Sequence, residues 1–113
     1  MAQNRTKLID LFIGNISNAV VHEILGKAID NDDVRGYYSR ELKVSFDKAR
    51  SYRGKINPPN TALPDKDINY IKDKIIRKVK VELQLRISKG YDNINLSLVE
   101  NMVKGVLKSM KVI

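Results

Sequence analysis

The single histidine, His22, and the glutamate that follows it are the first residues whose types suggest chemistry. A helical zinc site of the metalloprotease type needs a second histidine four residues after the first. Position 26 is Gly26, so that pattern is incomplete. We therefore expect His22 to be an interhelical histidine whose hydrogen bonds are satisfied. A catalytic role for it would require Asp10 and Glu41 to converge on it in the fold.

Three aspartates, Asp30, Asp32 and Asp33, have the oxygen ligands that a hard cation prefers. They lack the glycine and the distant glutamate of a calcium loop, and turn formation and helix capping account for aspartates at such a place. The Gly-Lys pairs at 26–27 and 54–55 lack the upstream glycine and the following serine or threonine of a phosphate loop. The sequence thus predicts no catalytic residue, no metal site and no cofactor, and it favours a non-enzymatic protein without deciding the question.

The segment 48–55, KARSYRGK, has the composition best suited to binding a polyanion. Its cations could contact phosphates, and Tyr52 could stack on a base. A similar basic group lies in the stretch 65–89. The alternative is that Tyr52 packs in the core, while the cations are solvated or cover apolar surface with their aliphatic stems. The candidate nucleic-acid contacts are Lys43, Lys48, Arg50, Arg53, Lys55, Lys74, Arg77 and Lys80.

The positive charge is concentrated in the middle of the chain. Of the net charge of +8, residues 34–89 contribute 15 basic and 6 acidic side chains, or +9. Residues 1–33 carry 3 basic and 5 acidic side chains, or −2. A one-sided field of this kind attracts polyanions, although a solvated lysine-rich face has the same composition.

Length and composition place the chain among small globular proteins. Its 113 residues, 42% of them hydrophobic, predict one domain over 1–113 with a true core. The absence of cysteine fits a reducing cytoplasm, which we expect to be the location. No uninterrupted apolar run approaches the roughly 18 residues of a membrane span, and the N-terminus lacks a signal-peptide pattern. We therefore expect no association with a membrane.

We expect the rest of the chain to be organised around the stretch 65–89, DKDINYIKDKIIRKVKVELQLRISK. Apolar residues recur in it every three or four positions from Ile68 to Leu83, which predicts a helix. From Val79 to Ile87 they also alternate strictly, which is typical of a strand. No glycine or proline separates the two patterns, and Gly90 follows as a helix C-terminal glycine should. We predict one continuous helix, with a strand at 79–87 as the alternative.

A helix over 65–89 places Val81 and Leu85 nearly opposite its main apolar stripe. Two apolar faces indicate burial on two sides. Either this helix lies at the centre of the bundle, or Val81 and Leu85 form a seam for self-association. The helical interpretation also returns Arg86 to the main stripe, so we expect Arg86 to be partly buried and paired with a carboxylate such as Glu82.

The remaining periodicities predict further helices at 5–29, 34–53 and 96–111, joined in part by the break at 54–64, GKINPPNTALP. The first two form an antiparallel hairpin because the turn between them is short. Gly14 falls inside the first helix, where it weakens the helix, splits it or permits close packing of a neighbour. Asn95 is expected to cap the last helix. The predicted fold is an all-α single-domain bundle of about four helices, with an α+β fold as the alternative.

Two hypotheses of function follow from these patterns. The first is a small basic helical module that binds nucleic-acid phosphates without sequence specificity. The alternative is a protein-interaction or oligomerising subunit without catalytic activity, assembled through Val81 and Leu85. Its partner is then another protein or a second copy of the chain.

Overall fold

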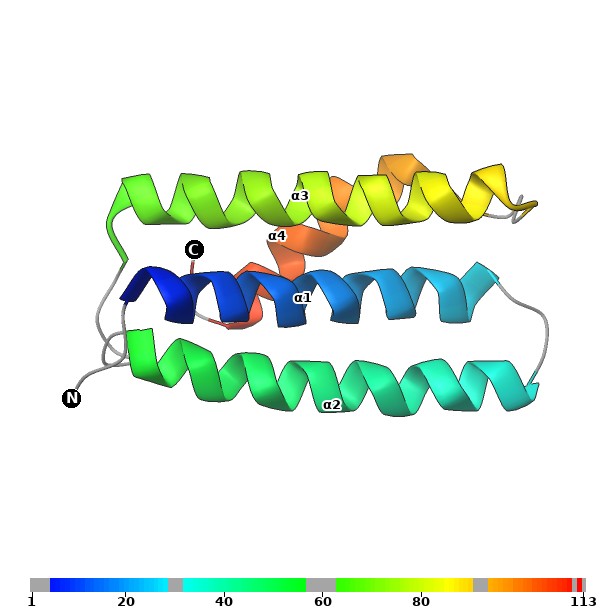
Figure 1. The fold of residues 1–113 in the computed structure, drawn as a ribbon, viewed down its shortest axis with the longest axis horizontal. Helices are drawn as coiled ribbons and strands as arrows, with labels where there is room; N and C mark the ends of the chain where they lie inside the picture. Colours follow the sequence, from blue (N-terminus) through cyan, green and yellow to red (C-terminus); the bar gives the residue numbers. More distant parts are fainter. Residues whose placement is uncertain (1–4, 29–31, 57–62, 91–93, 111, 113) are drawn as a thin grey trace.

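The computed structural model describes residues 5–28, 32–56, 63–90, 94–110 and 112 (Figure 1). It consists of α1 (Arg5–Ala28), α2 (Asp32–Ile56), α3 (Asp65–Ser88), the short 3₁₀ helix η1 (Leu96–Leu98) and α4 (Val99–Ser109). The all-α prediction is confirmed. The strand proposed at 79–87 is wrong, because α3 continues through that segment, and no strand occurs in the part of the chain described.

The helices form a layer of three with the fourth helix on one side of it. In Figure 1, α1 lies between α2 and α3, and α4 crosses behind α3 and α1. The packing of α1 against α2 is the most extensive in the molecule, and α4 packs on both α3 and α1. The antiparallel hairpin of the first two helices is thereby confirmed, whereas α3 runs parallel to α1.

The centre of the bundle is α1, and not α3 as the sequence suggested. Its side chains that are at most 1% exposed include Phe12, Ile13, Ile16, Val20 and Leu25, which point in several directions around the helix. A helix apolar on most sides must be buried in a core or in a membrane. Residues Arg5–Gly26 are long and apolar enough for a membrane span, but 61% of the apolar window is already buried in the bundle.

The surface of α3 is buried on one side only. Its core stripe is Ile71, Ile75, Val79 and Leu83, each fully buried. Val81 remains 50% exposed and Leu85 47% exposed, so the expectation of burial on two sides within the bundle is wrong. The reason is that both partners of α3, α1 and α4, lie along the same side of it.

The ends of α3 follow from local sequence. Pro64 is the residue before the helix, and its carbonyl accepts hydrogen bonds from the Asp67 and Ile68 backbone N–H groups at 2.9 and 3.0 Å. Gly90 ends the turn after the helix with φ of +104°, a conformation that side chains disfavour. Arg86 is partly buried and pairs with Glu82 at 3.9 Å, as predicted.

The other predicted boundaries need small corrections. Helix α2 begins two residues before position 34 and continues three beyond 53, because Gly54 weakens a helix without ending it and the first proline comes only at Pro58. The last helix is divided: the Asn95 side chain accepts from the Ser97 N–H at 3.0 Å and so caps η1, while α4 starts at Val99. Helix α1 continues through Gly14 without a break, and no neighbour lies within 4 Å of where its Cβ would be.

Of the remaining features predicted from the sequence, Asp30 and the prolines at 58–59 lie outside the described residues.

Candidate functional site

One side of α1 carries small and polar residues instead of apolar ones. Asp10, Gly14, Asn18 and His22 recur at intervals of four, and such residues share one helix face. Asp10 and Asn18 are exposed, and Gly14 and His22 are partly exposed, in a helix that is otherwise mostly buried. This stripe is the part of α1 that its neighbours leave open.

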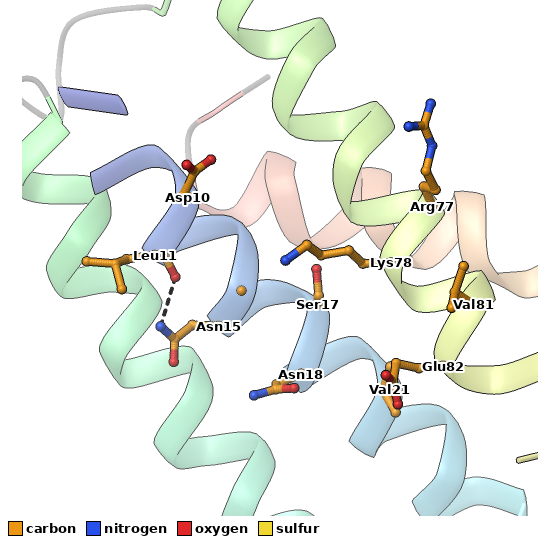
Figure 2. A pocket seen from close by; sticks show the side chains of 11 residues that line it. Asp10, Leu11, Asn15, Ser17, Asn18, Val21, Arg77, Lys78, Val81 and Glu82 are labelled. Atoms are coloured by element: carbon orange, nitrogen blue, oxygen red, sulfur yellow. Dashed lines mark hydrogen bonds between the residues drawn. The ribbon is translucent and has the colours of Figure 1, made fainter. Parts of the chain in front are cut away.

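The open stripe forms the floor of a hollow of about 600 Å³ between α1 and α3 (Figure 2). We call it the α1–α3 hollow. Helix α1 contributes seven of the residues that line it: Asp10, Leu11, Gly14, Asn15, Ser17, Asn18 and Val21. Helix α3 contributes the other four: Arg77, Lys78, Val81 and Glu82.

A second, smaller hollow of about 250 Å³ lies between α1 and α2. It is lined by Asn15 of α1 and by Lys48, Ser51, Tyr52 and Lys55 of α2. Asn15 borders both hollows, so they lie next to each other along α1, and we call the two together the trough, with α2 as one wall and α3 as the other. The Asn15 amide donates to the Leu11 carbonyl at 2.9 Å, which fixes its orientation on the floor.

Cations from both walls reach this trough. Lys48 and Lys55 come from α2, and Arg77 and Lys78 come from α3. In Figure 2 the Lys78 side chain extends across the α1–α3 hollow toward Ser17, whereas Arg77 points away from it. Lys78 was absent from the residues predicted from sequence. The periodicity that places it one turn from Lys74 was the signal that could have indicated it.

The carboxylates of the trough are already engaged. The Tyr70 hydroxyl donates to Asp10 at 3.2 Å, and Glu82 pairs with Arg86 at 3.9 Å. Desolvation raises the pKa of Tyr70, and the hydrogen bond to Asp10 and its charge raise it further, so the phenol stays protonated as a donor. The four wall cations, by contrast, form no ion pair among the described residues. The trough therefore presents a net positive surface.

Each wall also carries a tyrosine covered by a lysine. The Lys55 Nζ lies 5.6 Å from the Tyr52 ring centroid on α2. On α3 the Lys74 Nζ lies 5.9 Å from the Tyr70 ring centroid. Tyr52 is partly buried and Tyr70 is 41% exposed, so neither ring is sealed in the core. Both rings are thus placed at the edges of the trough with a cation above them.

The remaining candidates lie elsewhere. Lys43 is exposed on α2 but lines neither hollow, and Arg50 pairs with Asp47 at 3.3 Å. Lys80 is directed toward α4, where it pairs with Glu100 at 3.4 Å.

Arg53 differs from the other candidates because its side chain is buried. Only 4% of Arg53 is exposed, and burial lowers the pKa of its guanidinium. A residue so placed contributes to the α1–α2 interface and presents little charge to a ligand. Four of the eight predicted cations therefore lie at the trough: Lys48, Lys55 and Arg77 line it, and Lys74 lies over Tyr70 at its edge.

His22 lies on the same face of α1, beyond the hollows. Its ring packs against that of Tyr38 on α2, with centroids 5.4 Å apart, so the predicted position between helices is confirmed. The expectation of satisfied hydrogen bonds is wrong, because its buried Nδ1 forms none within the described structure. Burial lowers the pKa of His22; the charge of Glu41 opposes this shift and that of Arg86 adds to it. Asp10 lies twelve residues earlier on the helix, about 18 Å away at 1.5 Å per residue. The convergence required for a catalytic role does not occur. No group of three or more potential metal ligands gathers among the described residues.

Comparisons with known protein families, with curated proteins and with solved structures found no match to this chain.

Proposed function

We propose that this protein is a non-enzymatic binding module that holds the phosphates of a nucleic acid along the trough over α1. The observation that carries the proposal is the arrangement of unpaired cations on opposite walls of one trough. Lys48 and Lys55 lie on α2, and Lys78 on α3 extends over the α1–α3 hollow, with Arg77 at its outer edge. Composition alone supports only a basic surface. Two basic walls along a common groove match the regular charge of a phosphate backbone.

Electrostatics favours an extended polyanion over a single small anion as the ligand. The cations are distributed along both walls, two beside each hollow, and are not gathered around one enclosed pocket. Each contact with a phosphate releases condensed counterions, so several weak contacts add up to useful affinity at low salt. We place this activity in the cytoplasm, in line with the absence of cysteine from the chain.

The decisive experiment compares two variants of equal net charge. The trough variant replaces Lys48, Lys55, Arg77 and Lys78 with glutamine. The control variant replaces four cations outside the trough, all of them exposed: Lys43, Arg50, Lys104 and Lys108.

Binding of fluorescent oligonucleotides is then measured at several salt concentrations. We expect the trough variant to lose most of its affinity, and its salt slope to fall by about 0.7–0.9 for each phosphate contact removed. The control should retain the slope of the natural protein. Equal losses in the two variants, or no binding by the natural protein at low salt, would contradict the proposal.

The alternative function is that of an oligomerising subunit, and the exposure of Val81 and Leu85 favours it. These residues lie one turn apart on α3, where 50% and 47% of their surface remains open to solvent. A second copy of the chain could cover them. Sedimentation over a wide concentration range decides this point, since a monomer at the highest concentration excludes self-association through α3.

A further inference from the structure

The width of the trough bears on the kind of nucleic acid that can reach its floor. Packed helices lie about 8–10 Å apart, so α2 and α3, on opposite sides of α1, are at most about 20 Å apart. Each helix with its side chains is about 10–12 Å across, which leaves an opening of about 10 Å. A B-form duplex is wider than its own major groove of about 12 Å, so it can touch the rims but cannot enter.

The α1–α3 hollow has the chemistry of a nucleotide site. Its volume of about 600 Å³ lies within the range of small-ligand pockets. Its sides are apolar at Leu11, Val21 and Val81, whereas Asn18 supplies an amide on the floor. An amide can donate to and accept from a base edge, and the apolar sides suit the face of a base.

One buried polar atom in this hollow supports a ligand there. Ser17 is 6% exposed, and within the described structure its Oγ forms no hydrogen bond. Buried hydroxyls usually have a partner. In Figure 2 the Ser17 hydroxyl points toward the Lys78 side chain, and both residues line the hollow, so an oxyanion bound there could accept from both groups.

The tyrosines on the walls provide stacking surfaces for neighbouring bases. Tyr52 and Tyr70 lie on opposite sides of α1, each with a lysine over its ring. The bases of a single strand can stack on such rings, whereas those of a duplex are already stacked on one another. Aromatic side chains beside a basic groove are the usual means of holding single strands without sequence preference.

We infer that the trough binds single-stranded nucleic acid in preference to duplex, with one unstacked nucleotide seated in the α1–α3 hollow. Its phosphate is held by Lys78 and Ser17, and its base lies over Gly14 toward Asn18. This inference rests on the proposed function, which requires only that phosphates bind along the walls.

Gly14 offers a direct test, because a side chain there would fill the hollow without changing any charge. No neighbour lies within 4 Å of the position of its Cβ, so Gly14→Leu should fold. Gly105→Leu is the matched control, since Gly105 lies on α4 and also has open space around its Cβ. Asn18→Leu, compared with Asn101→Leu on α4, is a second pair that fills the same hollow; both asparagines are exposed.

Dissociation constants are measured for a single-stranded oligonucleotide and for a duplex taken from the same sequence. The two ligands carry the same number of phosphate charges. We expect the natural protein to bind the single strand at least about fivefold more tightly, the smallest effect of one stacked base. Gly14→Leu should weaken binding of the single strand and so reduce this preference, because the new side chain fills the hollow, whereas Gly105→Leu should leave the preference unchanged.

The outcomes separate the two proposals. If the natural protein binds single strand and duplex equally, and its binding still depends on salt through the wall cations, the nucleotide site is excluded and the proposed function stands. If neither binds, both fail. If Gly14→Leu and Asn18→Leu fold and keep the full preference, the α1–α3 hollow is not the site of the unstacked nucleotide.

Discussion

Arg53 and Lys78 show that the surroundings of a residue decide its role more than its type does. Arg53 belongs to the most basic segment of the chain, yet the fold buries its side chain. Lys78 is one of many lysines in α3, yet it extends over the floor of the trough (Figure 2). The difference arises from helix geometry: Arg53 shares the face of Ser45 and Ala49, which are both buried, and Lys78 falls beside the core stripe of α3.

His22 should make the stability of the protein depend on pH. Burial lowers its pKa in the folded state below the ordinary value of 6.5, so between these two values the unfolded chain binds more protons. The free energy of unfolding should therefore be highest above pH 6.5 and fall as the pH is lowered through the folded-state pKa. Urea unfolding between pH 7.5 and 5 measures this decrease.

His22→Gln is the control for that pH dependence, because it keeps a polar side chain of similar size without the titration. The step below pH 6.5 should disappear in this variant. A natural protein whose stability is constant over this range, or a variant that retains the step, would show that His22 is not its source.

At the scale of the elements, α1 forms both the centre of the core and the floor of the trough. Most of its surface forms the core, and a narrow stripe of small and polar residues forms the floor of the trough. Short side chains on that stripe leave open space above α1, between α2 and α3. Gly14 is the extreme case: its presence weakens the helix and has no steric cause, because nothing occupies the space beside it.

Substitution of two glycines by alanine should therefore have opposite effects. Gly14→Ala should stabilise the protein by about 1 kcal/mol, because alanine is the better helix former and its methyl group meets open space. Gly90→Ala should destabilise it by roughly 1–2 kcal/mol, because Gly90 has φ of +104°. Denaturant unfolding of both variants measures the two signs, and a loss of stability in Gly14→Ala would mean that a neighbour does pack on that position.

Two valines of α3 test which face of that helix is in the core. Val79→Asp should abolish folding or cost more than about 4 kcal/mol, because Val79 is fully buried and an unpaired buried charge is costly. Val81→Asp should change the stability of the monomer by no more than about 0.5 kcal/mol, since half of Val81 is exposed. Circular dichroism during thermal unfolding separates these results. A similar loss of stability in both variants would indicate that α3 is buried on two sides after all.

At the scale of the whole molecule, α4 completes the core by covering α1 and α3 on the side opposite the trough. Its fully buried residues are Val99, Val103 and Leu107, and the chain end adds the buried Val112. The molecule is elongated, measuring 44 × 24 × 22 Å, because α1, α2 and α3 lie along one another (Figure 1). Among the described elements, no helix covers one long side of the three-helix layer, and the linear ligand that we propose lies along that side.

The docking of α4 can be measured with two leucines. Leu107→Ala should cost about 2–5 kcal/mol, since it leaves a cavity at a fully buried position. That is a large part of the 5–15 kcal/mol that stabilises a typical domain. Leu98→Ala, at a position 45% exposed, should cost much less. Equal, small effects on the unfolding midpoint would indicate that α4 does not pack on the bundle as described.

The sequence by itself determined the number, type and approximate limits of the helices. Periodic apolar residues, the proline before Asp65 and the glycine after Lys89 are local signals, and they act within a few residues of where they stand. The same local rules placed Arg86 beside Glu82 and Asn95 at the start of the last helical segment, as the structure confirms.

Only the tertiary structure decided which helix is central and which cations share a surface. Both α1 and α3 are long and rich in apolar residues, and a helical pattern does not state how many neighbours will cover it. The packing of α2, α3 and α4 around α1 left Val81 and Leu85 exposed and buried Arg53. It also brought Lys48 and Lys78, thirty residues apart in the chain, to opposite walls of one trough, a juxtaposition that depends on contacts between helices and on no local signal.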